Sequence, residues 1–477
     1  MERRTFLSLS AVAAATILIG QSFIPSNRIN ASDFTSKLPI PPLFDGVEID
    51  GVVNYNLNIL EAKHSFFKDV QTDTYAINGT YLGPTLKLKN GKKVSINYTN
   101  RLKESTTMHG HGMHLPASMD GSPHQLIYPN DTWSAQYTVK QRACTNWYHP
   151  HPEGKTAEHV YKGLAGLMII EDDESQNLDI PKNYGVDDIP LVLQDRFFDR
   201  DGQIYYSPSM MQAMSGYISD TLVANGAISP YIDVEAKEIR LRLLNGSNST
   251  VYHLKFSDGR DFKQIAVDNS FLQKPVTLDY LRLSPGERAE IIIDLQDSIG
   301  KSFYLKELKT DKAFAKFNVS KQVTKTTKIP EVLTKLEKYS LDSVTNRRKF
   351  VLSAGMGALY INGESMKMDR IDEIVPINQV EIWEVYNQRM MMGMQHNFHI
   401  HGTHFTILER NGKSSNVYDN EKGYKDTVYV GSGESVKLLV KMTDYTDEKV
   451  PYMYHCHFLE HEDAGMMGQF IVRKDTI

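Results

Sequence analysis

A single cysteine between two histidines, close to the C-terminus, constrains the fold of this chain more than any other feature. The segment reads His455-Cys456-His457, and His461 and Met466 follow it closely. Side chains of an extended strand alternate between its two faces, so Cys456 would point one way and its neighbours the other. A thiolate, two histidines and a weakly bound methionine form the ligand set of a blue copper centre. The segment therefore predicts a strand that serves two metal sites, one on each face.

Three further histidine clusters supply the remaining ligands. They read His109-Gly110-His111, His149-Pro150-His151 and His396-Asn397-Phe398-His399-Ile400-His401. In a strand, the histidines of a His-x-His pair share a face, about 6–7 Å apart, and can bind neighbouring ions. His396 lies on the opposite face from His399 and His401, so we interpret it as the second histidine of the blue copper site.

The other clustered histidines predict a second site made of histidine alone. Imidazoles without a carboxylate suit copper better than calcium, magnesium or manganese. One His-x-His pair often arises by chance, but four clusters that hold most of the sixteen histidines do not. The predicted ligands of this site are His109, His111, His149, His151, His399, His401, His455 and His457. The remaining histidines are expected to be structural, although His114 and His404 lie beside clusters and could support the ligands.

Alternation and an internal repeat predict the architecture. Glycine-bounded segments with alternating apolar and polar residues, such as 81–100, 238–250 and 434–443, indicate β-sandwich domains. Tyr148-His149-Pro150-His151 is echoed by Tyr454-His455-Cys456-His457, so the first and last domains are expected to be copies. Only the last copy has the cysteine of a blue site. The histidine site must then lie between the two copies, with the middle domain as a spacer.

These motifs resemble a known family. The chain is similar to the multicopper oxidases of the laccase and cuprous oxidase superfamily in HGHG at 109–112, HPH at 149–151, HNFHIHG at 396–402 and HCHFLEHEDAGM at 455–466. The stretch 154–174 most resembles bacterial periplasmic copper-efflux oxidases. The resemblance implies an all-β fold of three cupredoxin-like Greek-key β-sandwich domains, at 45–175, 176–325 and 345–477, with a linker near 319–345. Gly110 stands where many members have a bulky aromatic residue, and we expect it to open the approach to the cluster.

The resemblance also implies a ligand set for four copper ions. Type 1 copper would be bound by His396, Cys456, His461 and Met466, type 2 copper by His109 and His399, and the type 3 pair by His111, His149, His151, His401, His455 and His457. Asp120 and Glu462 stand where the family has acidic proton donors; the alternative is that they are solvated turn residues. Such an enzyme takes single electrons from a reductant at the type 1 copper and reduces dioxygen to water at the other three.

Methionines suggest the reductant. Those between 390 and 394 lead directly into His396, and thioethers are soft ligands that suit Cu(I). Met392 and Met394 are therefore candidates to receive a cuprous ion beside the blue copper; the alternative is flexible core packing. A smaller cluster at 210–214 has no assigned role. Two further functions stay open: a laccase-type oxidase of phenols, aromatic amines or other metal ions, and a copper-binding electron carrier without catalysis.

The N-terminus predicts export. Arg3-Arg4 and the apolar run that follows read as a twin-arginine signal over about residues 1–31, and the run is shorter than the ~20 residues that cross a membrane. The protein is thus expected in the periplasm or another extracytoplasmic compartment, as a monomer without stable membrane insertion. A net charge of −5 gives no reason to expect nucleic acid as a partner. Cys144 is expected to be a small buried hydrophobe.

Overall fold

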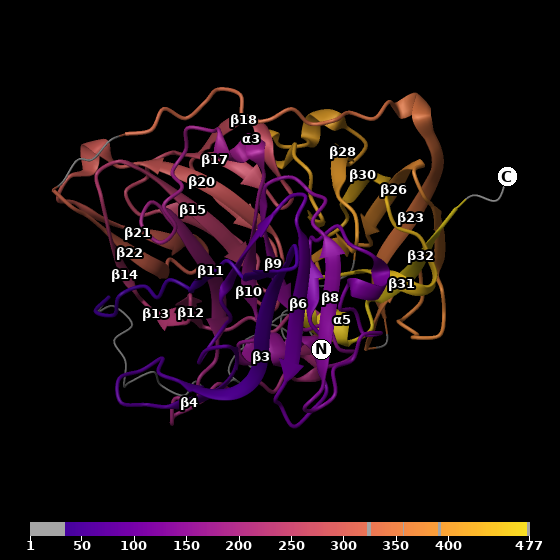
Figure 1. Cartoon of the computed structure of the whole chain (residues 1–477), viewed down its shortest axis with the longest axis horizontal. Helices are drawn as coiled ribbons and strands as arrows, with labels where there is room; N and C mark the ends of the chain where they lie inside the picture. The colour runs from indigo at the N-terminus through magenta and orange to yellow at the C-terminus, as the bar shows by residue number, and fades with distance from the viewer. Residues whose placement is uncertain (1–33, 322–325, 356, 390–392, 475–477) are drawn as a thin grey trace, which may run out of the picture.

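Three β-sandwiches follow one another along the chain (Figure 1). This computed structural model describes residues 34–321, 326–355, 357–389 and 393–474. Within these residues the strands pair into six sheets, two for each sandwich, as the alternating sequence pattern predicts. Across the same ranges, no helix is long and apolar enough to cross a membrane. The predicted export signal lies outside the described residues.

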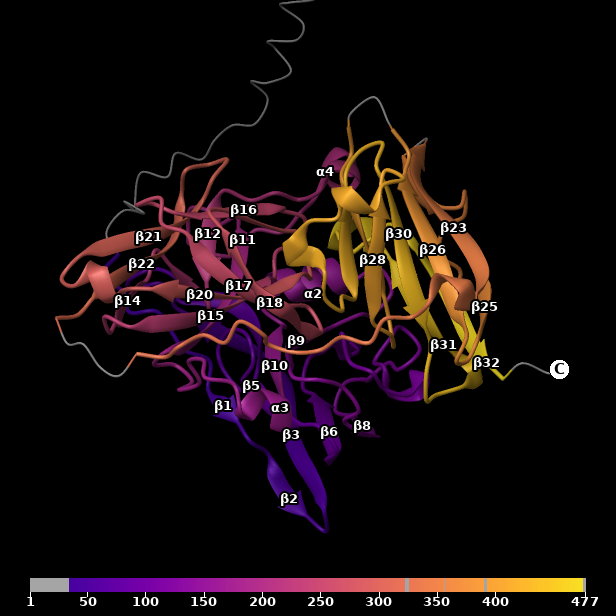
Figure 2. The same ribbon diagram turned by 90° about the horizontal axis from the view of Figure 1, so that it is seen from above.

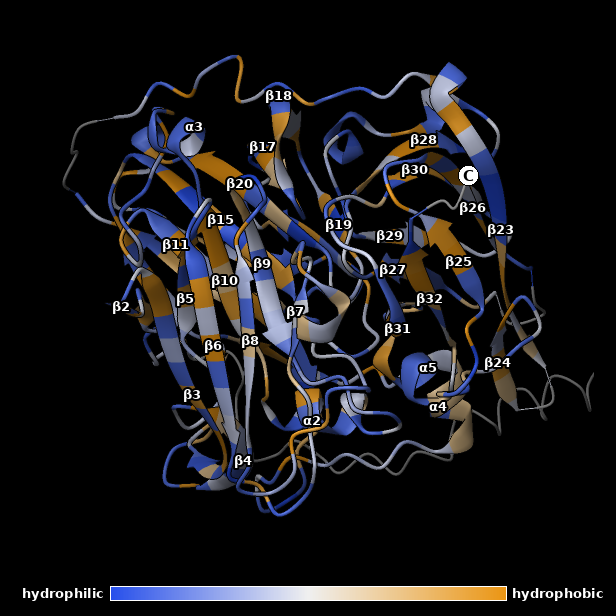
Figure 3. Cartoon of the chain, turned by 45° about the vertical axis from the view of Figure 1, so that its right-hand side comes forward, coloured by the Kyte–Doolittle hydropathy of each residue, from blue (hydrophilic) through white to orange (hydrophobic). Residues whose placement is uncertain are grey.

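The first sandwich holds the first two histidine clusters. Its elements are β1 (Leu43–Phe44), β2 (Val47–Ile49), β3 (Val52–His64), β4 (Thr72–Ile77), β5 (Thr85–Lys89), β6 (Lys93–Asn100), β7 (His109–His111), η1 (Ala117–Met119), β8 (Thr132–Thr138), β9 (Cys144–His149), α2 (Thr156–Lys162), β10 (Gly166–Glu171) and α3 (Asp173–Gln176). One sheet has the order β1-β5-β10-β9-β7 and the other β2-β3-β6-β8, with β4 paired to β3. In β3, Tyr55 and Leu57 are buried whereas Asn56 and Asn58 are exposed. Figure 3, coloured by hydropathy, shows hydrophobic and hydrophilic stretches following one another along β3.

Two central strands of the second sandwich are buried on both faces of their sheet. Its elements are β11 (Asp188–Arg196), α4 (Met210–Ser215), β12 (Thr221–Ala224), β13 (Ala227–Ile228), β14 (Tyr231–Val234), β15 (Glu238–Asn245), β16 (Tyr252–Phe256), β17 (Phe262–Val267), β18 (Ser270–Leu278), β19 (Leu281–Leu283), β20 (Arg288–Asp294), η2 (Gln296–Ser298), β21 (Ser302–Glu307) and β22 (Ala313–Val319). The sheets run β13-β12-β11-β15-β20-β17-β18 and β14-β22-β21-β16-β19. Every residue of β11 and β15 is buried, because β9 of the first sandwich covers the outer face, where Thr145 donates to Glu290 at 2.6 Å.

The third sandwich carries the cysteine. After η3 (Leu341–Ser343), its elements are β23 (Val344–Gly355), β24 (Ala358–Ile361), β25 (Glu373–Pro376), β26 (Val380–Asn387), β27 (His396–Ile400), β28 (Phe405–Arg410), η4 (Ser414–Asn416), η5 (Asp419–Glu421), β29 (Thr427–Val430), β30 (Ser435–Lys441), β31 (Asp447–His455), α5 (Leu459–Asp463) and β32 (Met467–Arg473). The sheets run β24-β23-β26-β30-β28 and β25-β32-β31-β27-β29. Their inner faces enclose Phe350, Trp383, Phe398 and Tyr454.

The internal sequence repeat corresponds to the same pairing of histidine-bearing strands in the first and third sandwiches. In the first sandwich β7 pairs with β9 so that His109 lies opposite His149. In the third, β27 pairs with β31 so that His399 lies opposite His455. Both pairings are antiparallel, so each sandwich presents its histidines at the ends of two neighbouring strands. Equivalent pairs of neighbouring strands in the two sandwiches therefore supply the two halves of the histidine site.

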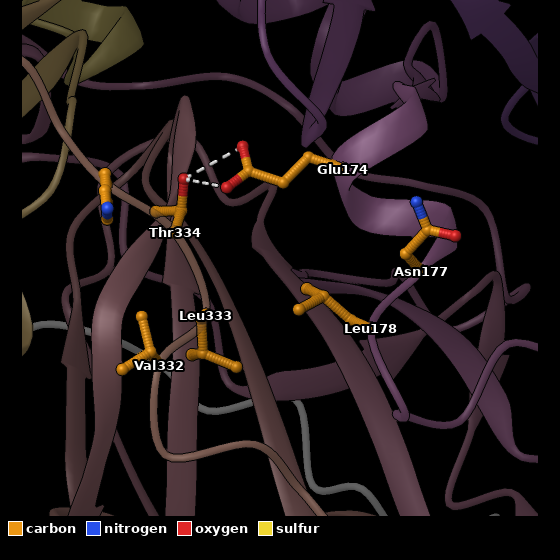
Figure 4. A pocket seen from close by; sticks show the side chains of 7 residues that line it. Glu174, Asn177, Leu178, Val332, Leu333 and Thr334 are labelled. Atoms are coloured by element: carbon orange, nitrogen blue, oxygen red, sulfur yellow. Dashed lines mark hydrogen bonds between the residues drawn. The ribbon is translucent and has the colours of Figure 1, made fainter.

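The described part of the predicted linker packs against the first and second sandwiches. It passes from the second to the third sandwich along the outside of the molecule (Figure 2). Leu333 is buried in a cluster with Ala143 and Phe271 of the first and second sandwiches. The hydroxyl of Thr334 donates to the Glu174 carboxylate at 3.1 Å, beside a shallow pocket (Figure 4). The segment is therefore anchored along its path.

Candidate metal centres

One sulfur and two imidazoles converge in the core of the third sandwich. His396 begins β27, Cys456 follows β31, and His461 lies in α5. The sulfur of Cys456 lies 3.5 Å from Nδ1 of each histidine, and the two Nδ1 atoms are 3.1 Å apart. Nε2 of His461 donates to the carbonyl of Met214 at 3.1 Å, so its Nδ1 carries a lone pair toward the sulfur. Three donor atoms of this type fit a blue copper ion.

Met466 is held beside this group by backbone hydrogen bonds. Its carbonyl accepts the N–H of Cys456 at 3.1 Å, and its own N–H donates to the carbonyl of His461 at 2.9 Å. Met466 and Cys456 are both fully buried in the same apolar cluster. Burial raises the pKa of the Cys456 thiol to about 12, so a thiolate at neutral pH requires a cation beside the sulfur.

A second group of buried histidines lies between the first and third sandwiches. Nε2 of His455 lies 3.2 Å from Nε2 of His151 and 3.0 Å from Nε2 of His401. Burial lowers the pKa of His151 and of His455 to about 3. These imidazoles are therefore neutral, which is the form that binds metal ions. The three ring nitrogens come from both copies of the repeat, as the sequence predicted.

The other five histidines extend this group. Nδ1 of His111 lies 3.4 Å from Nε2 of His149, and the His457 ring stands beside both, with centroid separations of 4.8 and 5.2 Å. The Nε2 atoms of His109 and His399 are buried without a hydrogen-bond partner. A buried nitrogen without a partner is costly in an apoprotein. The whole set therefore fits a cluster of metal ions.

Hydrogen bonds on the outer nitrogen orient these rings. Nδ1 of His109, His149 and His399 donates to the carbonyls of Asp120, Pro150 and Asp426, at 2.8, 2.8 and 2.9 Å respectively. Because the outer nitrogen carries the proton, the inner Nε2 keeps its lone pair for a metal. The rings are thus preset as ligands by the backbone.

Two buried carboxylates each contact histidines of both sandwiches. Asp120 follows η1 in the first sandwich, and its Oδ2 accepts from Nδ1 of His401 at 2.7 Å. Glu462 lies in α5 of the third, with its oxygens 3.3 Å from Nδ1 of His151 and 3.2 Å from Nδ1 of His455. Burial raises the pKa of Glu462, although His151 partly offsets it. Neither residue is exposed, so the reading of both as solvated turn residues is wrong.

Two details of the sequence interpretation change. β31 ends at His455 and β27 at Ile400, so Cys456, His457 and His401 lie just beyond the strands, although the alternation of faces continues through them. A side chain at Gly110 would lie 3.1 Å from Cγ of Met113, in the core of the first sandwich. Gly110 therefore opens no path to the histidines, because it faces away from them. Cys144 is buried, as predicted.

The two methionine clusters, at 390–394 and 210–214, differ in what the structure describes of them. Met392 lies outside the described residues, and Met394 is half-buried, with its carbonyl bound to Asn387 at 3.0 Å. The smaller cluster forms α4, whose Met214 carbonyl receives the His461 hydrogen bond. The side chains of Met210 and Met211 in this helix are 75% and 66% exposed. The cluster at 210–214 is thus connected to the predicted copper ligand His461 through the backbone of Met214, while the roles of Met392 and Met394 stay predictions.

The second sandwich contributes contacts to the histidine group that no sequence motif indicates. Gly286 touches two imidazoles, since a Cβ there would lie 3.1 Å from Nδ1 of His457 and 3.2 Å from Cε1 of His111. Arg288 pairs with Asp426, whose Oδ1 accepts from Nε2 of His111 at 2.9 Å. Arg288 and Asp426 have no spacing signal in the sequence that would connect them to the histidines. The middle domain is thus more than a spacer.

Comparison with known proteins agrees with this geometry. Multicopper oxidase family profiles match residues 58–175, 187–327 and 331–476. The chain therefore belongs to the multicopper oxidase family, which makes it an oxidoreductase with copper cofactors that uses dioxygen and a reductant. Its three sandwiches are cupredoxin-like Greek-key domains, as predicted.

Individual relatives cover nearly the whole chain. It is 37% identical to the multicopper oxidase mco of Staphylococcus aureus over 450 residues, which is 94% of this chain and 95% of that protein. A solved laccase-like multicopper oxidase, CueO of Ochrobactrum sp., is 35% identical, with a TM-score of 0.84 over 91% of this chain and all of that one. The cell division protein FtsP of Xenorhabdus nematophila is 35% identical over 99% of this chain and 98% of its own length.

Proposed function

We propose that this chain is a four-copper oxidase that transfers single electrons from a reductant to dioxygen and forms water. The type 1 ligands are His396, Cys456, His461 and Met466; the type 2 ligands are His109 and His399; the type 3 ligands are His111, His149, His151, His401, His455 and His457. The observation that supports this assignment is the position of Cys456. Its sulfur faces His396 and His461, while its chain neighbours belong to the histidine group. Bound copper supplies the electron transfer and the oxygen reduction.

The protein supplies protons and excludes water. Glu462 and Asp120 lie at the Nδ1 side of histidines from both sandwiches, beside the site at which reduction of dioxygen to water would consume protons. Both carboxylates are fully buried, so proton delivery depends on these groups rather than on bulk water.

A cuprous ion is the reductant that the structure supports best. Helix α4 covers the Nε2 edge of His461 through the carbonyl of Met214, and the exposed thioethers of Met210 and Met211 lie on the same helix. Thioethers suit Cu(I). A cuprous ion bound by Met210 and Met211 would be separated from the type 1 ligand His461 by one turn of α4 and by the hydrogen bond between His461 and Met214. The proposed role is therefore cuprous oxidation in copper tolerance.

Phenol oxidation is the second candidate reductant chemistry. The Ochrobactrum relative has oxidase activity towards lignin model compounds. In this chain, however, a phenol could not bond to Nε2 of His461 unless α4 moved, because the Met214 carbonyl already occupies that edge. A role in cell division, which the FtsP relative suggests, would require neither buried Cys456 nor the histidine cluster.

Oxygen consumption by the copper-loaded protein, on Cu(I) and on a bulky phenol, tests these alternatives. We expect four copper ions per chain and faster turnover on Cu(I). Met210→Leu with Met211→Leu should lower Cu(I) turnover about 10-fold or more and leave phenol turnover unchanged; Met442→Leu, at a buried core methionine, is the volume-matched control. Unchanged Cu(I) turnover in the double variant would disprove the role of α4. A chain without bound copper or oxygen uptake would favour the division role.

We also propose that the protein acts as a monomer outside the cytoplasm, after export by the twin-arginine route. The support is the Arg3-Arg4 pair and the apolar run after it. Cell fractionation with Arg3→Lys and Arg4→Lys together tests the route. The variant is expected to stay in the cytoplasm, and normal export of it would contradict the proposal.

A further inference from the structure

Arg288 stands where the three sandwiches meet. It begins β20 and is 1% exposed. Nε donates to the carbonyl of Thr145 at 3.0 Å and Nη2 to Oδ1 of Asn146 at 2.8 Å, both on β9 of the first sandwich. Nη1 donates to the carbonyl of Gly286 at 2.8 Å in its own sandwich. The last two N–H groups go to Asp426 of the third, at 2.8 Å from Nη1 and 2.5 Å from Nη2. All the donors of a guanidinium are thus used.

Asp426 passes this constraint to a histidine. Its Oδ1 accepts from Nε2 of His111 at 2.9 Å and from the Thr427 hydroxyl at 2.8 Å. Its Oδ2 accepts from Nδ2 of Asn269 at 2.6 Å. With the two bonds from Arg288, these contacts fix the plane of the carboxylate. An ionised carboxylate only accepts hydrogen bonds, so the Nε2 atom of His111 must carry the proton.

The His111 ring is therefore reversed relative to its neighbours. Six of the eight histidines direct Nδ1 away from the group, toward a carbonyl or a carboxylate: His109, His149, His151, His399, His401 and His455. His111 instead directs Nε2 outward, and its Nδ1 lies 3.4 Å from Nε2 of His149, inside the group. His111 is the histidine of this group whose Nε2 lies within hydrogen-bond distance of the Asp426 side chain, and its ring is the reversed one.

The backbone at Gly112 packs closely against the ion pair of Arg288 and Asp426. Gly112 has φ of +79°, and a Cβ there would lie 2.5 Å from Oδ2 of Asp426 and 2.7 Å from Nη2 of Arg288. The ion pair thus packs against the chain directly after His111. Lys425 extends the contact, with Nζ 2.9 Å from Asp268 and 3.1 Å from Glu287 of the second sandwich. Buried ion pairs therefore join the second sandwich to Lys425 and Asp426, the two residues before β29 of the third sandwich.

We propose that Arg288 is a positioning residue for the histidine centre: by clamping Asp426 it fixes the proton of His111 on Nε2 and presents Nδ1 to the metal. The inference rests on the proposed function in that the metal is copper. It assigns the second sandwich a role in setting the coordination of a cluster to which it contributes no ligand. Partners of this kind affect metal affinity or activity by about 10–100-fold.

The test compares Arg288→Met with the wild type, both loaded with copper. Copper per chain, the blue absorption, and the electron paramagnetic resonance and near-ultraviolet signals of the histidine centre are measured. We expect weaker copper binding at the histidine centre, by about 10–100-fold, with an altered signal there and an unchanged blue absorption. A variant with four copper ions and a wild-type signal from the histidine centre would overturn the inference alone. A wild-type protein that binds only the blue copper would overturn the proposed function as well.

Arg242→Met is the matched control. Arg242 is also buried in the second sandwich and pairs with Asp188 and Glu290, at 2.7 and 3.0 Å, without touching a histidine. Both variants should melt at a lower temperature as apoproteins, because each removes a buried cation that pairs with buried carboxylates. Only the Arg288 variant should change the histidine centre. If Arg288→Met does not fold, Arg288→Lys replaces it against Arg242→Lys: lysine keeps the charge but cannot bridge both oxygens of Asp426. Equal copper signals in the two lysine variants would refute the inference.

Discussion

The third sandwich has a blue copper site, and the first sandwich has the same construction without the ligands. By the repeat, Thr106, Pro150, His159 and Leu164 take the places of His396, Cys456, His461 and Met466. His159 precedes Gly163 by the same interval as His461 precedes Gly465. Nδ1 of His159 lies 3.0 Å from the Thr106 hydroxyl, where in the third sandwich Nδ1 of His461 lies 3.1 Å from Nδ1 of His396.

This comparison separates the scaffold from the metal site. In both sandwiches a short helix follows the second strand of this pair, α2 after β9 in the first and α5 after β31 in the third. In the first, the Thr106 hydroxyl replaces a histidine nitrogen, Pro150 replaces the cysteine sulfur and Leu164 replaces the thioether. Nδ1 of the remaining histidine has the Thr106 hydroxyl as its hydrogen-bond partner. The same fold can therefore be built with or without a blue copper site, and the donor atoms at these positions decide whether copper binds.

The largest expected effect follows removal of the sulfur. Cys456→Ser should abolish the blue absorption, lower the copper content by one ion and reduce oxygen uptake to the uncatalysed background, because electrons then have no path from the reductant. Absorption spectra, copper analysis and an oxygen electrode measure these changes. Cys144→Ser is the matched control, since Cys144 is buried in the first sandwich and should not affect the copper. Residual turnover in Cys456→Ser would show that the histidine centre accepts electrons directly.

A smaller effect is expected at the carboxylate between the sandwiches. Glu462→Gln should lower kcat about 10²-fold and leave copper content and blue absorption unchanged. Burial raises the pKa of Glu462, so the wild-type donor stays protonated to a higher pH than a free glutamate. The wild-type kcat should therefore fall as pH rises through this pKa, and the variant should lose that limb of the profile.

Glu460→Gln is the control for Glu462. Glu460 lies in the same helix and is also buried, but its carboxylate binds Asn248, at 2.8 Å, and Ser249 rather than a histidine. We expect lower stability without the change in kcat or in the pH profile. An equal loss of kcat in both variants would mean that substitution disturbs α5 as a whole.

The sequence could predict the division of ligands because side-chain parity is local. The placement of Cys456 opposite His455 and His457 needs only an extended backbone, and the repeat shows which sandwiches meet. The role of Arg288 could not be predicted in this way, because it depends on how three domains pack around Asp426, far apart in the chain. Helix α4 was missed for the same reason: Met214 reaches His461 through a backbone carbonyl, which no side-chain pattern reveals.

The smallest effect tests whether the copy in the first sandwich is purely structural. His159→Ala removes one of the two hydrogen-bond partners of the buried Thr106 hydroxyl and leaves only the Thr107 carbonyl, which should lower the free energy of unfolding by about 1–3 kcal/mol. Copper content and blue absorption should not change, whereas His461→Ala should lose the blue absorption entirely. Chemical denaturation and visible spectra of both variants make the comparison. Helix α2 contacts α5, which carries His461. A weaker blue absorption in His159→Ala would therefore mean that the packing of α2 affects the copper site through α5, and that the two repeated sites are not independent.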